Sequence, residues 1–172
     1  ARAPEQSEIY FHPKEAAQSS VRIEFGTHEY NPALEPRLQL YNEYFAGGMA
    51  GMVFQELREA RALAYSAGAR YITGYKAEDE DLMIGAIQSQ ADKTEDALVA
   101  FLELFDQMPV SPERFQMARE ALINNYRAGK IGFREVAGAV RAWERRGLEP
   151  DPRRQWFEGV QAATIEDMMQ FY

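Results

Sequence analysis

The chain has 172 residues, of which 46% are hydrophobic and 27% are charged, a balance typical of one globular domain rather than of a disordered or coiled-coil protein. Its formal net charge of −8 disfavours nucleic acid and anionic membrane surfaces as partners, because both repel an acidic protein. The absence of cysteine excludes a disulfide framework, a thiolate nucleophile and a cysteine-type zinc site, and leaves the redox compartment open.

The N-terminal region carries the first strand signals. Residues 1–8 are expected to form a linker without the apolar block of a signal peptide, and to run into a strand at Ile9–Phe11. Residues 21–25 alternate apolar and charged side chains, which is typical of a half-buried strand, and Gly26 ends it. No apolar run is long enough to span a membrane. The folded domain is therefore expected to comprise residues 9–172.

Two helices separated by a glycine turn are expected next. Asn31–Pro32 is a typical helix start, with asparagine as the N-cap and proline in the first turn. This helix is expected to run through Phe45 and to end at Gly47–Gly48. The following helix, over residues 49–60, repeats apolar residues on one face, which predicts that it packs against a core.

A hairpin completes the predicted strands. One strand is expected from about residue 64 to residue 75, followed by an acidic hairpin at residues 78–81 that we interpret as a solvated tip. The return strand, residues 82–90, carries apolar side chains on both faces, with Leu82, Ile84 and Ala86 on one side and Met83 and Ile87 on the other. This pattern is typical of a sheet that helices cover on at least one side.

The second half of the chain is helical. The expected starts are Asp92 with Glu95, Ser111–Pro112, Phe133, the segment around Trp156, and Thr164, whose helix runs to Tyr172. Strands gather in the first half and helices in the second. The sequence therefore predicts an α+β fold with an antiparallel-rich sheet packed against helices.

The sequence contains none of the catalytic motifs that a self-contained hydrolase would need. His12 and His28 belong to neither H-E-x-x-H nor H-x-x-E-H, and both are expected to be surface or turn residues. Ser66 is not in a G-x-S-x-G elbow, and residues 78–81 lack the spacing of a calcium loop. The glycine-rich residues 47–51 lack the Lys-Ser/Thr of a phosphate-binding loop. We predict no catalytic residue, metal site or cofactor in this chain.

Two residues remain as candidates for a functional site. Arg58 lies beside the apolar stripe of the second helix, where its guanidinium could reach a cleft while its aliphatic stem stays packed. Tyr65 opens the following strand, so its hydroxyl could lie near the same place. The alternative is structural: an arginine at a helix–sheet junction and a tyrosine that fills the core.

The segment around these residues resembles the inactive half-domains of the insulinase/pitrilysin peptidases, which include the mitochondrial processing peptidase. The resemblance is carried by a glycine turn at Gly47–Gly48, F-Q-E-L-R-E at Phe54–Glu59, and A-L-A-Y-S at Ala62–Ser66. Weaker matches in the same order are Gln18–Ser20, Ser111–Phe115 and Thr164–Asp167. The resemblance thus covers nearly the whole chain.

The resemblance implies a role for Arg58 and Tyr65. In that family the active half carries the zinc ligands, and the inactive half presents an arginine and, seven positions later, a tyrosine to the active cleft. Arg58 and Tyr65 match that pair in type and spacing. The implied partners are an active zinc-bearing half, in the same longer chain or a separate subunit, and a peptide substrate. The zinc cofactor would belong to the partner half.

The sequence departs from the family pattern in two places. Met49–Ala50–Gly51 stands where larger residues or serine are usual, and the chain ends inside the last helix where a further strand is usual. We therefore expect a half-domain without its final strand. A structural or assembly subunit with no proteolytic role is the alternative function, and a stand-alone peptide-binding module is a third. A bacterial periplasm or cytoplasm is favoured as the compartment.

Overall fold

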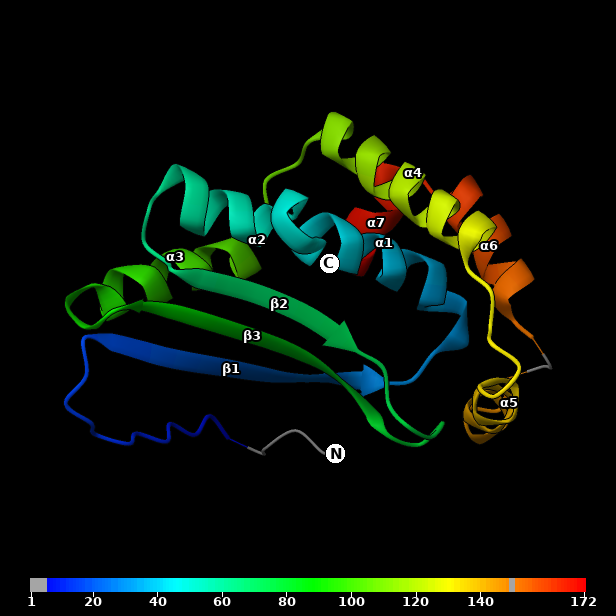
Figure 1. The fold of residues 1–172 in the computed structure, drawn as a ribbon, viewed down its shortest axis with the longest axis horizontal. Helices are drawn as coiled ribbons and strands as arrows, with labels where there is room; N and C mark the ends of the chain where they lie inside the picture. Colours follow the sequence, from blue (N-terminus) through cyan, green and yellow to red (C-terminus); the bar gives the residue numbers. More distant parts are fainter. Residues whose placement is uncertain (1–5, 149–150) are drawn as a thin grey trace.

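The computed structural model describes residues 6–148 and 151–172, in which helices cover one face of an antiparallel sheet (Figure 1). The strands are β1 (Gln18–Glu29), β2 (Ser66–Ile72) and β3 (Glu80–Gln90). The helices are α1 (Glu35–Ala46), α2 (Met52–Phe54), α3 (Thr94–Asp106), α4 (Pro112–Ala128), α5 (Val136–Arg145), α6 (Arg153–Ala162) and α7 (Ile165–Phe171). Shorter 3-10 turns occupy Pro32–Leu34, Gly48–Ala50 and Ala91–Lys93, and a π-helical turn occupies Gln55–Ala60. The predicted α+β class is confirmed.

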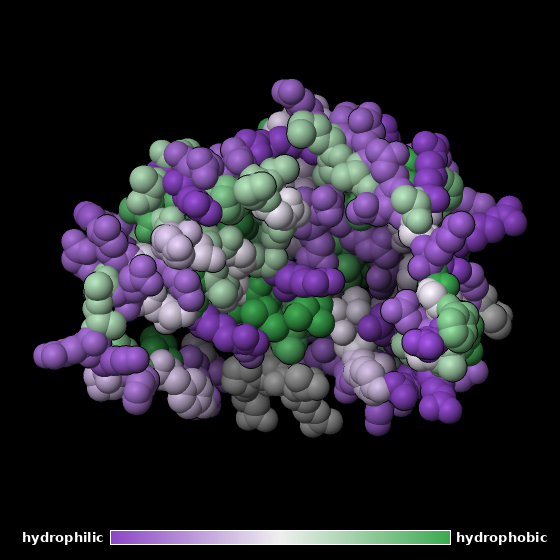
Figure 2. Space-filling view, viewed as in Figure 1, coloured by the Kyte–Doolittle hydropathy of each residue, from purple (hydrophilic) through white to green (hydrophobic). Residues whose placement is uncertain are grey.

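The described part of the sheet has the order β1-β3-β2, with β3 in the centre. Met83 is opposite Phe25 on β1 and Tyr71 on β2, so all three belong to one cross-strand row. Along β3 the side chains at positions 83 and 87 are buried under the helices, as their alternation predicts. Leu82 and Ile84 point to the other face, where Figure 2 shows apolar side chains over the middle of the sheet.

The strand expected at Ile9–Phe11 is wrong. Residues 6–16 form neither helix nor strand, and the three large side chains at positions 9–11 are exposed. The segment runs beside β1 as an irregular trace (Figure 1). A strand is stabilised by ladder hydrogen bonds to a neighbour, and among the described residues no strand pairs with residues 9–11.

Helix α1 lies at the centre of an aromatic core. Tyr41 stacks on Phe45 with ring centroids 5.2 Å apart, and Phe45 meets Phe105 of α3 at 5.3 Å. Phe101 packs against Phe105 at 4.9 Å, and Phe171 of α7 lies 5.5 Å from Tyr41. Each large side chain buried in this way stabilises the fold by about 2 kcal/mol. The first and last helices are therefore joined through one core.

A buried polar cluster closes the β2–β3 hairpin. The Asn42 amide donates to the Tyr71 carbonyl at 2.9 Å and accepts from the Tyr71 N–H at 2.8 Å, which fixes the edge of β2 to α1. Asp81 accepts from the Gly74 N–H at 2.8 Å and from the Tyr71 hydroxyl at 3.3 Å, and Thr27 lies 2.8 Å from that hydroxyl. Asp81 is only 2% exposed. The expectation of a solvated acidic tip is therefore wrong for this residue, because its carboxylate accepts hydrogen bonds inside the hairpin.

Three predicted helix caps are confirmed, although Asn31 caps the 3-10 turn Pro32–Leu34 and α1 itself begins at Glu35. The helix expected from Phe133 begins only at Val136. Asn31, Ser111 and Thr164 each accept a hydrogen bond from a backbone N–H two or three residues on. The start predicted at Asp92 is wrong: this residue lies in a 3-10 turn, and α3 begins at Thr94 without a side-chain cap.

The glycine turn between α1 and α2 is confirmed, but the helix that follows is not regular. Gly48 has a φ of +59°, a conformation that glycine adopts without strain. A Cβ atom on Gly51 would lie 2.6 Å from the Gly47 nitrogen, so only glycine allows this close approach. The continuous α-helix expected over residues 49–60 is instead a 3-10 turn, a short α2 and the π-helical turn. Composition and periodicity do not distinguish these helix types.

Candidate functional site

Arg58 lies in the π-helical turn Gln55–Ala60 that follows α2. Its side chain is 47% exposed, and its guanidinium lies 4.8 Å from the centre of the Phe54 ring. The nearest carboxylate is that of Glu59, at 3.7 Å, which is long for an ion pair and exposed to solvent. The aromatic contact therefore supports the stem of Arg58 while its donors remain accessible.

Tyr65 lies immediately before β2 and is fixed by its backbone. Its N–H donates to the Gln88 carbonyl of β3 at 2.8 Å. Its side chain is 68% exposed, and within residues 6–148 and 151–172 no hydrogen bond engages its hydroxyl. The structural alternative of a core-filling tyrosine is therefore wrong for Tyr65. A fixed backbone with an exposed phenol suits a group that contacts a ligand.

The loop between the two residues has an unusual backbone. The Leu57 carbonyl accepts from the N–H groups of both Leu63 and Ala64, at 2.9 and 3.2 Å, and Leu57 itself is fully buried. Ala62 has a φ of 52°, which is uncommon for a residue with a side chain. A π-helical turn and a left-handed residue in succession are found at functional sites more often than elsewhere.

The structure places Arg58 and Tyr65 at the two ends of this loop. In the part of the chain that the structure describes, no hydrogen bond or ring contact joins their side chains. Arg61 between them donates to Glu103 of α3 at 3.0 Å, which ties the loop to the helix layer. Sequence reasoning found the two side chains but missed the π-helical turn and the Gln88 backbone contact, for which the sequence contains no local signal.

The described residues were also compared with the requirements of a metal site and of a membrane-spanning helix, and they meet neither. No group of three or more His, Asp or Glu side chains among the described residues is arranged to hold a metal ion. The side chain of His28 lies outside the described part of the chain, and His12 is exposed. No helix in residues 6–148 and 151–172 is long and apolar enough to cross a membrane.

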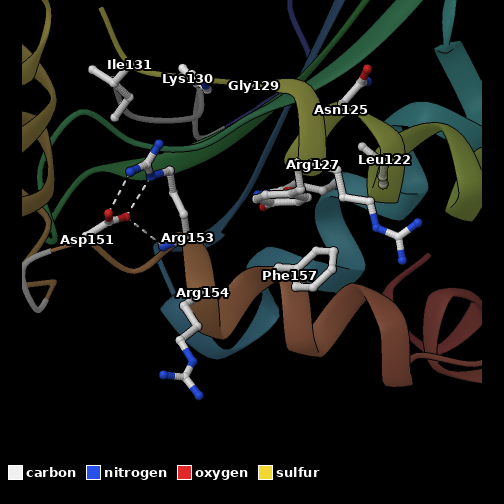
Figure 3. A pocket seen from close by; sticks show the side chains of 12 residues that line it. Leu122, Asn125, Arg127, Gly129, Lys130, Ile131, Asp151, Arg153, Arg154 and Phe157 are labelled. Atoms are coloured by element: carbon white, nitrogen blue, oxygen red, sulfur yellow. Dashed lines mark hydrogen bonds and ion pairs between the residues drawn. The ribbon is translucent and has the colours of Figure 1, made fainter. Parts of the chain in front are cut away.

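Two cavities of the described structure lie away from Arg58 and Tyr65. The larger, about 760 Å³, lies between the end of α4 and the start of α6 (Figure 3). The smaller, about 450 Å³, lies beside the glycine turn and the start of α4. Neither cavity is lined by Arg58 or Tyr65. Both residues of the candidate pair are exposed to solvent.

One protein family matches most of the sequence. The sequence profile described as "Peptidase M16 inactive domain" matches residues 2–122. No curated protein sequence matches the chain.

Three solved structures illustrate the fold. A peptidase M16 inactive domain from Pseudomonas fluorescens superposes with a TM-score of 0.75 at 17% identity over 91% of this chain. A protease from Helicobacter pylori gives 0.74 at 12% over 93%, and the periplasmic protease PqqL from Escherichia coli gives 0.71 at 13% over 91%. The chain spans only 37%, 38% and 18% of those three chains.

Proposed function

Because the chain belongs to the family of peptidase M16 inactive domains, we propose that it is the non-catalytic half of a zinc metallopeptidase and binds peptide for an active half. The observation that carries the proposal is that the family match over residues 2–122 includes both Arg58 and Tyr65, which lie exposed at the ends of one loop. Side chains that are exposed and make no strong interaction within the described chain are available to bind a ligand.

The proposed role of the pair is to donate hydrogen bonds to the peptide carbonyl that the partner half attacks. A guanidinium and a phenol are donors, and donors directed at developing negative charge contribute about 3 kcal/mol to a transition state. Arg58 is supported by the Phe54 ring, and Tyr65 is held by the Gln88 carbonyl. Both groups would thus meet the peptide with little loss of conformational freedom.

The partner is an active half that supplies the zinc and the remaining chemistry, either in the same longer polypeptide or as a separate subunit. The described residues of this chain provide no ligand group for zinc. An extended peptide could pair with the outer edge of β1, which has no strand neighbour among the described residues. This chain would then bind and orient the peptide.

The test is cleavage of a quenched peptide by a mixture of this chain and its zinc-bearing half. Arg58→Ala and Tyr65→Phe are each expected to lower kcat roughly tenfold or more while the two halves still associate. Tyr75→Phe is the matched control, because Tyr75 is an exposed tyrosine outside the loop. Association is measured separately by analytical ultracentrifugation.

Two outcomes would overturn the proposal. If both variants cleave like the parent chain, the pair does not contact the reacting carbonyl. If the active half cleaves equally well without this chain, the chain is a structural or assembly subunit. Loss of activity with the Tyr75→Phe control would show that the assay reports general damage and not the pair.

A further inference from the structure

A basic region interrupts the acidic surface of this chain. Residues 127–154 contain eight Lys or Arg and four Asp or Glu, a net charge of +4. The whole chain carries −8, so the remaining residues carry −12. The basic region comprises the end of α4, α5 and the start of α6, and these elements lie at the opposite end of the molecule from α2 (Figure 1).

The larger cavity borders this basic region, which supplies its charged lining residues, and it has an apolar floor. Leu122, Tyr126, Ile131 and Phe157 line it, and the Tyr126 and Phe157 rings meet edge to face with centroids 5.8 Å apart. The Tyr126 hydroxyl donates to the Gln39 side chain at 2.6 Å, so its polar end is satisfied and its ring is left to line the cavity. A volume of about 760 Å³ is within the range of small-ligand sites.

The cations around the cavity are not equally available. Arg153 is held by Asp151, with two nitrogen–oxygen distances of 2.6 Å, and this guanidinium lowers the pKa of the Asp151 carboxyl. Arg154 pairs with Glu158 at 3.0 Å. In residues 6–148 and 151–172 no hydrogen bond or ion pair engages the side chains of Arg127 and Lys130. Figure 3 shows Arg127 directed away from the Asp151–Arg153 pair. Two cations at the rim are therefore free for an anionic ligand.

We propose that this cavity binds the C-terminal carboxylate of a peptide whose last residue is apolar. An apolar floor beside free cations requires a ligand that carries an apolar group and an anion close together. In a peptide only the C-terminal residue combines an apolar side chain with a carboxylate, because Asp and Glu place the charge on the side chain itself. Guanidinium and ammonium groups are the usual partners of carboxylates. A small apolar carboxylic acid shares this chemistry, and the test separates the two.

The inference rests on the proposed function, since it assumes that peptides bind this chain. It adds a direction to that binding. The cavity and the Arg58–Tyr65 loop lie at opposite ends of the molecule (Figure 1), so a peptide anchored by its C-terminus would extend from the basic region toward the acidic remainder of the chain. The separation also allows the two sites to be tested independently.

The experiment measures the anisotropy of a peptide that is labelled at its N-terminus and ends in Leu-Phe, as the free acid and as the amide. The free acid is expected to bind this chain roughly tenfold more tightly than the amide, as for one hydrogen-bonded charge pair. Lys130→Glu and Arg127→Glu should each lower the affinity of the free acid to that of the amide and leave the amide unchanged. Arg119→Glu is the matched control for Arg127→Glu, because both residues lie on α4, Arg119 does not line the cavity, and the charge change is equal.

Three outcomes would overturn the inference: equal affinity of acid and amide, an equal loss with Arg119→Glu, or displacement of the peptide by phenylpropionate as effective as by unlabelled peptide acid. The last outcome would make the cavity a site for small carboxylic acids. If acid and amide bind equally while Tyr65→Phe still lowers cleavage, the anchor alone is wrong. If neither form binds at any concentration, the proposed peptide-binding function fails with it.

Discussion

Two tyrosines at the two ends of β2 differ in burial and in the hydrogen bonds of their hydroxyl groups. Tyr71 is 6% exposed, its hydroxyl contacts Thr27 and Asp81, and both its backbone groups bond the Asn42 amide. Tyr65 is held only through its backbone, and its phenol is exposed. The comparison shows that residue type does not distinguish a tyrosine with a structural role from one whose hydroxyl is exposed to solvent. The partners of the hydroxyl distinguish them.

The two ends of β2 differ in the same way as the two tyrosines: one end is held by buried hydrogen bonds, and the other carries an exposed side chain. At the hairpin end, buried hydrogen bonds connect β2, β3 and α1, so the backbone there is expected to open only with the whole fold. At the other end, the π-helical turn and the positive φ of Ala62 precede an exposed side chain. Stability is therefore expected to depend on the hairpin end, and ligand binding on the loop end.

Asp81→Ala should have the largest effect on stability, and it tests whether the hairpin end of β2 stabilises the fold. It removes the buried acceptor of the Gly74 N–H and one of the contacts of the Tyr71 hydroxyl, which is expected to cost about 3 kcal/mol of unfolding free energy. Urea unfolding followed by circular dichroism measures the change. Glu78→Ala is the control, because Glu78 belongs to the same acidic run but is exposed and should change stability by less than about 0.5 kcal/mol. Equal effects of the two variants would show that burial of Asp81 does not stabilise the hairpin.

Tyr71→Phe should have an intermediate effect that depends on pH. The lost hydroxyl contacts are expected to cost about 1 kcal/mol at neutral pH. Burial raises the pKa of Tyr71 from 10.0 to about 12, so in the parent the stabilisation is complete below pH 10 and is lost as the pH rises from about 10 to 12. Phenylalanine does not ionise, so the variant should lose less stability over that interval. Unfolding at pH 7, 10 and 12 tests this, and parallel losses in both proteins would contradict it.

The sequence contains the local parts of this architecture. The caps at Asn31, Ser111 and Thr164 and the glycine turn depend on neighbours within a few residues, and local chemistry predicted them correctly. The alternation along β3 likewise predicted which of its side chains share a face, although it did not predict which face is the buried one.

The predictions that were wrong concern features that depend on contacts between residues distant in sequence or on the type of helix. Asp81 is buried because Thr27 and Tyr71 come from other strands, and an acidic run gives no sign of such partners. Strand formation at Ile9–Phe11 would have required pairing with another strand, and in the described part of the chain residues 9–11 pair with none. The Arg58–Tyr65 pair is supported by the resemblance to a family, and spacing alone favours the structural alternative for both residues.

Tyr65→Phe should have the smallest effect on stability. It therefore tests most directly whether the Tyr65 hydroxyl, unlike that of Tyr71, has no role in folding. Its hydroxyl is exposed and has no partner in the described part of the chain, so its removal should change the unfolding free energy by less than about 0.5 kcal/mol. Urea unfolding beside Tyr71→Phe gives the measurement. A loss as large as that of Tyr71→Phe would mean that the hydroxyl stabilises the loop, and a reduced cleavage rate would then no longer indicate contact with the peptide. An unchanged stability together with slower cleavage can arise only if the hydroxyl acts on something outside the folded chain.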